Sequence, residues 1–271
     1  MAYFLTDDNV KLFYEVKGEG QKTIVLIHGW SAHHLFYKKQ IPELSKDYKV
    51  VYYDLRGHGL SERPDDGYTI SRYAQDLKNL IDFLRLENVS LVGWSMGTHI
   101  MFDYVKQFGL DDIEKMIIID MTAKLITDEE YHCGLYGQFS MEDNLATMVS
   151  MNENWKTFAD AFVPAIYAKT GCKDKDDLQW NYEEAYKNSA TVMTRMWISM
   201  SAQDYRDLLP SITVPTMIAF GEASCLYNRD NSEYLNRMIK DSKLVGFPNC
   251  GHGLQLEDAV KFNKEVKDFI G

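Results

Sequence analysis

Apolar and polar residues follow one another along this chain in blocks that predict strands and helices in turn. From Val10 to Val16 the two kinds alternate, which is typical of a strand buried on one face. Shorter runs in which most residues are apolar predict strands buried on both faces, as in a parallel sheet. These runs are Ile24–Ile27, Val50–Tyr53, Val89–Val92 and Met116–Ile119.

Helices are predicted between these strands. From Ile70 to Leu86 apolar residues recur three or four positions apart, so they lie on one face of a helix. A second helix is expected over Thr98–Gln107. Alternating strands and helices predict an α/β fold with a mostly parallel central sheet, helices on its faces and right-handed crossovers.

This alternation stops after Asp120. Residues 121–212 show little strand pattern and are rich in methionine and aromatic residues. We therefore expect an α/β core formed by residues 1–120 and 213–271, with a helical lid inserted at 121–212 that shields an apolar pocket. In the last part of the core we expect a strand at Val214–Phe220, a helix at Ser232–Lys240, a strand at Lys243–Phe247 and a helix from Ala259 onward.

Composition and charge exclude several classes of function. Hydrophobic residues make up 45% of the 271 residues, as in folded globular proteins, and the formal net charge of −11 disfavours nucleic acid and anionic membranes as partners. The four cysteines form no C-x-x-C pair, so no metal site is expected. The N-terminal segment lacks a signal-peptide pattern, and no apolar run is long enough to span a membrane, which predicts a cytoplasmic protein.

The most specific motif is Gly93-Trp94-Ser95-Met96-Gly97, which matches G-x-S-x-G. It lies between a predicted strand and a predicted helix, the context of a nucleophile elbow. In such a turn the serine hydroxyl is presented at a helix N-terminus, where developing negative charge is favoured. Ser95 is therefore the predicted nucleophile.

A second motif, His28-Gly29-Trp30, follows the strand Ile24–Ile27. There the backbone N–H of Trp30 can pair with that of Met96 to form an oxyanion hole. Because they flank these motif positions, Trp30, Trp94 and Met96 are also expected to line the substrate pocket. His33 and His34 are expected at the surface or at the rim of the site.

Together, four motifs resemble those of the α/β-hydrolase fold family in order and spacing: His28-Gly29-Trp30, Asp54 to Ser61, the Ser95 turn and Gly251-His252-Gly253. The resemblance covers the core and implies that His252 is the catalytic base. A serine needs such an imidazole to take its proton. The resemblance also implies that Asp54 to Ser61 is a structural loop, with Arg56 and His58 holding turns.

The catalytic acid departs from the family pattern. The family most often carries it on G-x-x-D after the penultimate strand, but here Ser224 ends the segment Gly221-Glu222-Ala223-Ser224. One explanation is a degenerate site or a dyad. The other, which we favour, is an acid at the end of the preceding strand, where Asp120 follows Met116–Ile119 in register. Glu222 is the alternative acid.

The resemblance implies a serine hydrolase without cofactor or metal. We expect it to cleave a small or medium apolar carboxylic ester or lactone through an acyl-enzyme. A cofactor-free haloperoxidase or perhydrolase would use the same residues and is an alternative, as is cleavage of a carbon–carbon bond. A hydrolase-fold small-molecule receptor with slow turnover is a further alternative, favoured by Ser224 in the usual acid position.

Overall fold

The computed structural model describes residues 2–271, which contain one eight-stranded sheet. The strand order is β1-β2-β4-β3-β5-β6-β7-β8. β1 and β2 pair antiparallel with their neighbours and all other pairs are parallel, so the expected mostly parallel sheet is confirmed. The strands are β1 (Ala2–Leu5), β2 (Lys11–Lys17), β3 (Thr23–Ile27), β4 (Lys49–Tyr53), β5 (Val89–Trp94), β6 (Ile113–Ile119), β7 (Thr216–Gly221) and β8 (Ser242–Phe247).

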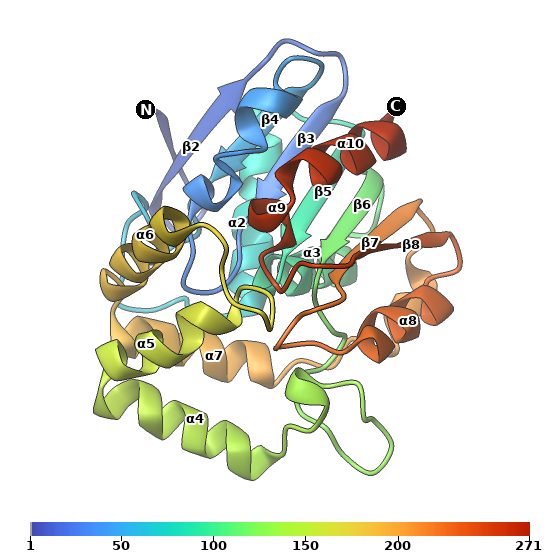
Figure 1. Ribbon diagram of the computed structural model, residues 1–271. Coiled ribbons are helices and arrows are strands. Elements are labelled where there is room, and N and C mark those ends of the chain that lie inside the picture. Colours follow the sequence, from blue (N-terminus) through green and yellow to red (C-terminus); the bar gives the residue numbers. More distant parts are fainter. Residues whose placement is uncertain (1) are drawn as a thin grey trace.

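Helices cover both faces of this sheet (Figure 1). Alternate residues of β3 enter different apolar clusters: Val25 and Ile27 pack on one face, and Ile24 and Leu26 on the other. This two-sided burial explains why the strand reads as a continuous apolar run. One cluster includes residues of α2 (Ile70–Leu84), α3 (Met96–Phe108) and α8 (Arg229–Met238), and the other includes residues of α1 (Ile41–Leu44) and α10 (Ala259–Ile270).

The chain between the neighbouring strands β6 and β7 forms a group of helices at one end of the sheet (Figure 1). They lie within the range 121–212 that the sequence sets apart; its role as a lid stays a prediction. Trp30 of the core packs edge-on against Phe162 and Trp197, with ring centroids 5.2 and 5.5 Å away. The helices are α4 (Met141–Glu153), α5 (Trp155–Ala165), α6 (Lys175–Tyr186) and α7 (Ala190–Ser201).

Two local details differ from the sequence expectations. Strand β1 is four residues long and has no clear pattern of its own; it is fixed by antiparallel pairing with β2. Helix α2 ends at Leu84 because Arg85 adopts the left-handed conformation, with φ 51°.

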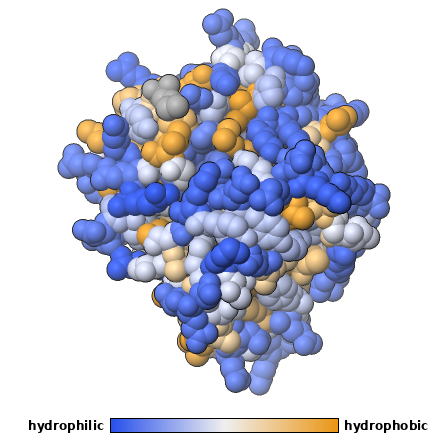
Figure 2. Space-filling model, turned by 60° about the vertical axis from the view of Figure 1, so that its left-hand side comes forward, coloured by the Kyte–Doolittle hydropathy of each residue, from blue (hydrophilic) through white to orange (hydrophobic). Residues whose placement is uncertain are grey.

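The surface is predominantly polar on the face drawn in Figure 2, where hydrophobic residues lie in small separate groups. Within residues 2–271 there is no helix with the length and apolar character needed to cross a membrane.

Candidate active site

Ser95 lies in a sharp turn between β5 and α3. Its backbone has φ 54° and ψ −123°, a conformation that costs a non-glycine residue about 1–3 kcal/mol. The Ser95 N–H donates to the carbonyl of Ile119 at 3.0 Å, which ties the turn to β6. Gly97 is required because a Cβ there would lie 2.4 Å from the Ile27 carbonyl oxygen. The surrounding strands therefore hold Ser95 in its strained position.

Asp120 occupies the equivalent position at the end of β6 and also has positive φ, 44°. Its side chain is buried, with 1% exposed. The Oδ1 atom accepts a hydrogen bond from the backbone N–H of Gly221 at 3.1 Å. The Oδ2 atom accepts one from the Ser224 hydroxyl at 2.9 Å and lies 2.9 Å from Nδ1 of His252. The fold thus brings Asp120 and His252 together from distant parts of the sequence.

His252 is buried in the loop after β8. The indole Nε1–H of Trp94 donates to the His252 carbonyl at 2.8 Å, and the Gly253 N–H donates to the Ile166 carbonyl at 2.7 Å. An ionised Asp120 can only accept, so its contact assigns the ring proton to Nδ1. The neutral imidazole then has its lone pair on Nε2, the atom that a general base uses.

Glu222, the alternative acid, and Ser224, at the usual acid position of the family, lie in different surroundings. Glu222 is exposed, and within residues 2–271 its carboxylate forms no hydrogen bond with His252. Ser224 is buried and donates to Asp120, while its Oγ accepts from the backbone N–H groups of Leu226 and Tyr227 at 3.2 and 3.3 Å. Ser224 is therefore a hydrogen-bonding partner of the carboxylate, a role that sequence reasoning missed. The sequence signal for this role was the position of Ser224 in the loop after β7, the strand next to β6, which ends before Asp120.

Ser95 and His252 border the same cavity, although no hydrogen bond joins their side chains within the described part of the chain. The cavity measures about 20 Å³ of space open to the centre of a water molecule, which is room for about one water. Its other lining residues are mostly apolar or aromatic: Trp30, Leu135, Tyr136, Phe162, Trp197, Met200, Leu226 and Tyr227.

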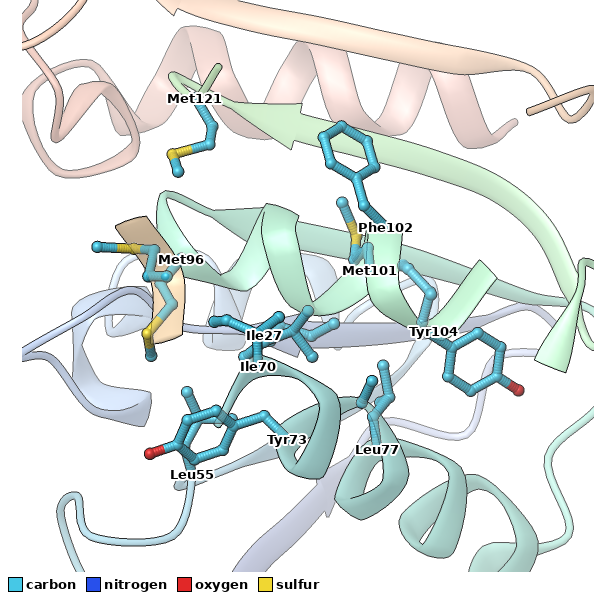
Figure 3. Close-up of a cluster of buried hydrophobic side chains, with 14 of the residues drawn as sticks. Ile27, Leu55, Ile70, Tyr73, Leu77, Met96, Met101, Phe102, Tyr104 and Met121 are labelled. Atoms are coloured by element: carbon cyan, nitrogen blue, oxygen red, sulfur yellow. The ribbon is translucent and has the colours of Figure 1, made fainter. Parts of the chain in front are cut away.

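Of the three expected pocket residues, the structure places only Trp30 in this cavity; Trp94 and Met96 do not line it. Trp94 faces the opposite cluster, where its ring stacks on Phe36 with centroids 5.4 Å apart. Met96 is fully buried in the cluster drawn in Figure 3, together with Ile27 and Met121. Flanking a motif position in sequence therefore did not place these two side chains in the pocket.

The backbone amides expected to bind an oxyanion lie next to Ser95. Met96 is the first residue of α3, and the first N–H groups of a helix have no intrahelical partner. The Trp30 N–H forms no hydrogen bond with residues 2–271. A Cβ on the preceding Gly29 would lie 3.0 Å from Ser95 Cβ, so this loop passes close to the serine.

His28 and the loop after β4 form hydrogen bonds that hold the backbone. His28 Nε2 accepts from the Leu55 N–H at 3.0 Å, and burial lowers the pKa of His28 to about 4. Arg56 is completely buried and donates twice to Asp76, at 2.7 Å each. The ring of His58 lies 5.0 Å from that of His28.

Of the two places expected for His33 and His34, the surface is wrong, since they are buried with 8% and 9% exposed. They do not line the Ser95 cavity, and a position at its rim stays a prediction. With Asp54 they form the one group among the described residues whose ligand atoms could hold a metal ion. However, Asp54 Oδ1 already contacts the backbone N–H and Nδ1 of His34 at 2.8 Å, and Oδ2 accepts from Leu60 N–H at 2.8 Å. Burial alone would raise the pKa of Asp54, but hydrogen bonding and the charge of His34 lower it to about 2. These contacts satisfy Asp54 without a metal ion.

Comparison with known proteins gives matches over nearly the whole chain. The family model described as alpha/beta hydrolase fold matches residues 22–259. AB hydrolase superfamily protein YisY from Bacillus subtilis (strain 168) is 32% identical over 269 residues, which cover 98% of each chain.

Solved structures are similar over the same length. An esterase from Exiguobacterium antarcticum has a TM-score of 0.92 at 25% identity and covers 99% of this chain and 98% of its own. A bromoperoxidase from Bacillus anthracis has a TM-score of 0.92 at 26% identity and covers 99% of each chain. These two proteins share the fold but are named for different activities.

Proposed function

The chain belongs to the alpha/beta hydrolase fold family, and from this premise we propose that it is a serine hydrolase acting on small or medium apolar carboxylic esters or lactones. The observation that carries the proposal is the arrangement around His252. One ring nitrogen lies 2.9 Å from buried Asp120, and the residue borders the same apolar cavity as Ser95. This arrangement supports Ser95 as nucleophile, His252 as base and Asp120 as acid, on three separate loops at one end of the sheet.

In the proposed reaction Ser95 Oγ attacks the carbonyl carbon while His252 Nε2 takes the hydroxyl proton. The negative oxygen of the tetrahedral intermediate accepts hydrogen bonds from the backbone N–H groups of Trp30 and Met96, and removal of one such donor costs about 2.7–4 kcal/mol. When the intermediate collapses, the ester C–O bond breaks and His252 gives its proton to the leaving alcohol oxygen. Asp120 orients the imidazole and stabilises its protonated form.

Water completes the cycle by attacking the acyl-enzyme. His252 takes a proton from this water and returns it to Ser95 Oγ, so the free acid leaves and the enzyme is restored. These steps require neither a metal ion nor an organic cofactor. The apolar lining supports a substrate with an apolar acyl or alcohol group.

A perhydrolase or haloperoxidase activity is the second candidate, favoured by the 26% identity to the bromoperoxidase from Bacillus anthracis. In that reaction hydrogen peroxide replaces water and attacks the acyl-enzyme carbonyl. The products are a peracid and the free serine. The peracid then oxidises a halide in solution.

Steady-state hydrolysis of 4-nitrophenyl esters of increasing acyl length, together with simple lactones, tests the proposal. We expect many turnovers per enzyme molecule and none with Ser95→Ala. A single burst no larger than the enzyme concentration would contradict it and support a receptor with slow turnover. Peracid formation from acetate and hydrogen peroxide, measured in parallel, tests the perhydrolase activity separately from ester hydrolysis.

A further inference from the structure

The cavity at Ser95 is closed around a space too small for an ester. Its volume of about 20 Å³ compares with about 300–1,000 Å³ for pockets that hold small molecules. Most lining side chains are buried, including Leu226 at 3% and Tyr227 at 5% exposed, whereas Tyr136 is 52% exposed. Tyr136 therefore lies between the cavity and the solvent, with its phenol end inside, since burial raises the pKa of its hydroxyl.

The backbone at Tyr136 and just before it is anchored by hydrogen bonds. Tyr136 lies in the short 3-10 helix η2 (Leu135–Gly137) with φ 57°, and its N–H donates to the Leu226 carbonyl at 2.7 Å. The Leu135 N–H donates to the Leu125 carbonyl at 2.9 Å. The Asn231 side-chain amide donates to the carbonyl of Gly134 at 3.1 Å. Movement at this point is therefore easier for the side chain than for the loop.

The other large polar aromatics of the cavity are held by their polar atoms. Trp30 Nε1 donates to the Met193 carbonyl at 3.0 Å, and Trp197 Nε1 donates to Asn144 Oδ1 at 2.7 Å. The Tyr227 hydroxyl contacts Met121 Sδ at 3.2 Å.

The Tyr136 hydroxyl, in contrast, forms no hydrogen bond with any residue from 2 to 271. The ring of Tyr136 has one aromatic neighbour among these residues, Phe139, at a centroid distance of 6.0 Å. Rotation of Tyr136 breaks fewer interactions than rotation of any of the other three aromatics.

We propose that Tyr136 is the gate of the Ser95 cavity and determines how large an ester group can enter. The inference rests on the proposed hydrolase function, which it deepens by naming the residue that selects substrates by size. The phenol is bulky enough to close the entrance and is not fixed in place by a hydrogen bond. Its hydroxyl is therefore dispensable, while its ring is not.

Kinetics of three variants test the gate. Tyr136→Ala removes the ring, Tyr136→Phe removes only the hydroxyl, and Phe83→Ala removes an aromatic ring of α2 that is similarly exposed, at 53%. We expect the ratio of kcat/KM for a branched or long-chain ester to that for the acetate to rise about tenfold in Tyr136→Ala, a size typical of pocket-fit effects. The ratio should stay unchanged in Tyr136→Phe and Phe83→Ala.

A second measurement does not depend on turnover. In a Ser95→Ala background, acrylamide quenching of tryptophan fluorescence reports access to the five tryptophans, of which Trp30 and Trp197 line the cavity. Tyr136→Ala should steepen the quenching slope, and Phe83→Ala should not. Steeper quenching without hydrolysis in any variant would overturn the hydrolase function but support the gate. Hydrolysis in all variants, with neither the kcat/KM ratio nor the quenching changed by Tyr136→Ala, would overturn the gate alone.

Discussion

The Ser224 hydroxyl donates to Asp120 Oδ2 at 2.9 Å, and Nδ1 of His252 lies 2.9 Å from the same oxygen atom. The position at which the family most often carries its acid thus holds a residue that binds the carboxylate from the neighbouring strand. A hydrogen bond to a charged group is worth about 1.5–3 kcal/mol. Ser224 therefore helps to hold the Asp120 carboxylate in the orientation that contacts His252.

Ser224→Ala should lower both activity and stability. The change removes a donor to Asp120 and leaves the backbone N–H groups of Leu226 and Tyr227 without their acceptor. We expect a loss of about 1–3 kcal/mol in the free energy of unfolding, and about tenfold in kcat, which corresponds to about 1.4 kcal/mol. Urea denaturation and ester kinetics measure these two quantities. Ser150→Ala, on the exposed side of α4, is the matched control and should change neither.

Asp120→Asn should remove most of the turnover, whereas Glu222→Gln should leave it near the wild-type rate. Asparagine lacks the charge that stabilises the imidazolium, and this change in a serine triad lowers kcat about 10⁴-fold. Glu222 is exposed and has no hydrogen bond to His252 within residues 2–271. Ester kinetics, with circular dichroism to establish folding, measure the contrast. The reverse pattern would assign the acid to Glu222.

A carboxylate moved to position 224 should restore part of the activity lost in Asp120→Asn. Ser224 Oγ already lies within hydrogen-bonding distance of the oxygen that contacts His252, so Ser224→Asp in that background brings a charge close to the ring. When Asp120 is unchanged, Ser224→Asp would place two carboxylates together and raise the pKa of one of them. This single variant should therefore have a lower kcat near neutral pH. The pH profiles of kcat for the single and double variants provide the test. If Ser224→Asp restores no activity to the Asp120→Asn protein, position 224 cannot replace Asp120.

Much of the fold was predictable because its strands are buried on both faces and read as apolar runs. Val89–Val92, for example, is predicted as a strand and forms the first four residues of β5 (Val89–Trp94). Strand β1 was missed, since four residues that depend on pairing with β2 carry too little pattern. The domain boundaries and the cytoplasmic location stay predictions.

Site residues that lie in sequence motifs could be predicted, but the orientation of side chains that depends only on packing could not. Ser95 was found from a short motif, His252 from the resemblance to the family and Asp120 from its position at a strand end, but their catalytic roles stay proposals. The side chains of Trp94 and Met96 turn into opposite apolar clusters, an outcome that the sequence around Ser95 does not reveal. Tyr136 was missed because its position at the cavity depends on a hydrogen bond to Leu226, ninety positions further along the chain.

Acid should destabilise the protein through its buried histidines. Burial lowers the pKa of His99 from 6.5 to about 4, and its Nε2 lies 2.9 Å from the Thr122 carbonyl oxygen. Between these two pH values the unfolded chain binds a proton that the native state does not. The free energy of unfolding therefore falls as the pH is lowered from 6.5 to 4, by up to about 1.4 kcal/mol per pH unit for each such histidine.

His99→Gln should make this dependence shallower, because glutamine does not titrate. His132→Gln, at an exposed position, is the matched control and should leave the slope unchanged. Urea denaturation at several pH values between 4 and 7 measures the slope. An identical slope for His99→Gln and wild type would mean that His99 does not contribute.

The central claim is that Ser95 is the nucleophile, and it is tested most directly by the mass of the protein after reaction with a small fluorophosphonate. Attack by Ser95 Oγ expels fluoride and leaves one phosphonyl group on the serine, which peptide mass spectrometry locates. We predict a single adduct at Ser95 in the wild type, none in Ser95→Ala, and slower labelling in Asp120→Asn. An adduct of the same extent in Ser95→Ala, or an unlabelled wild-type protein, would contradict the account.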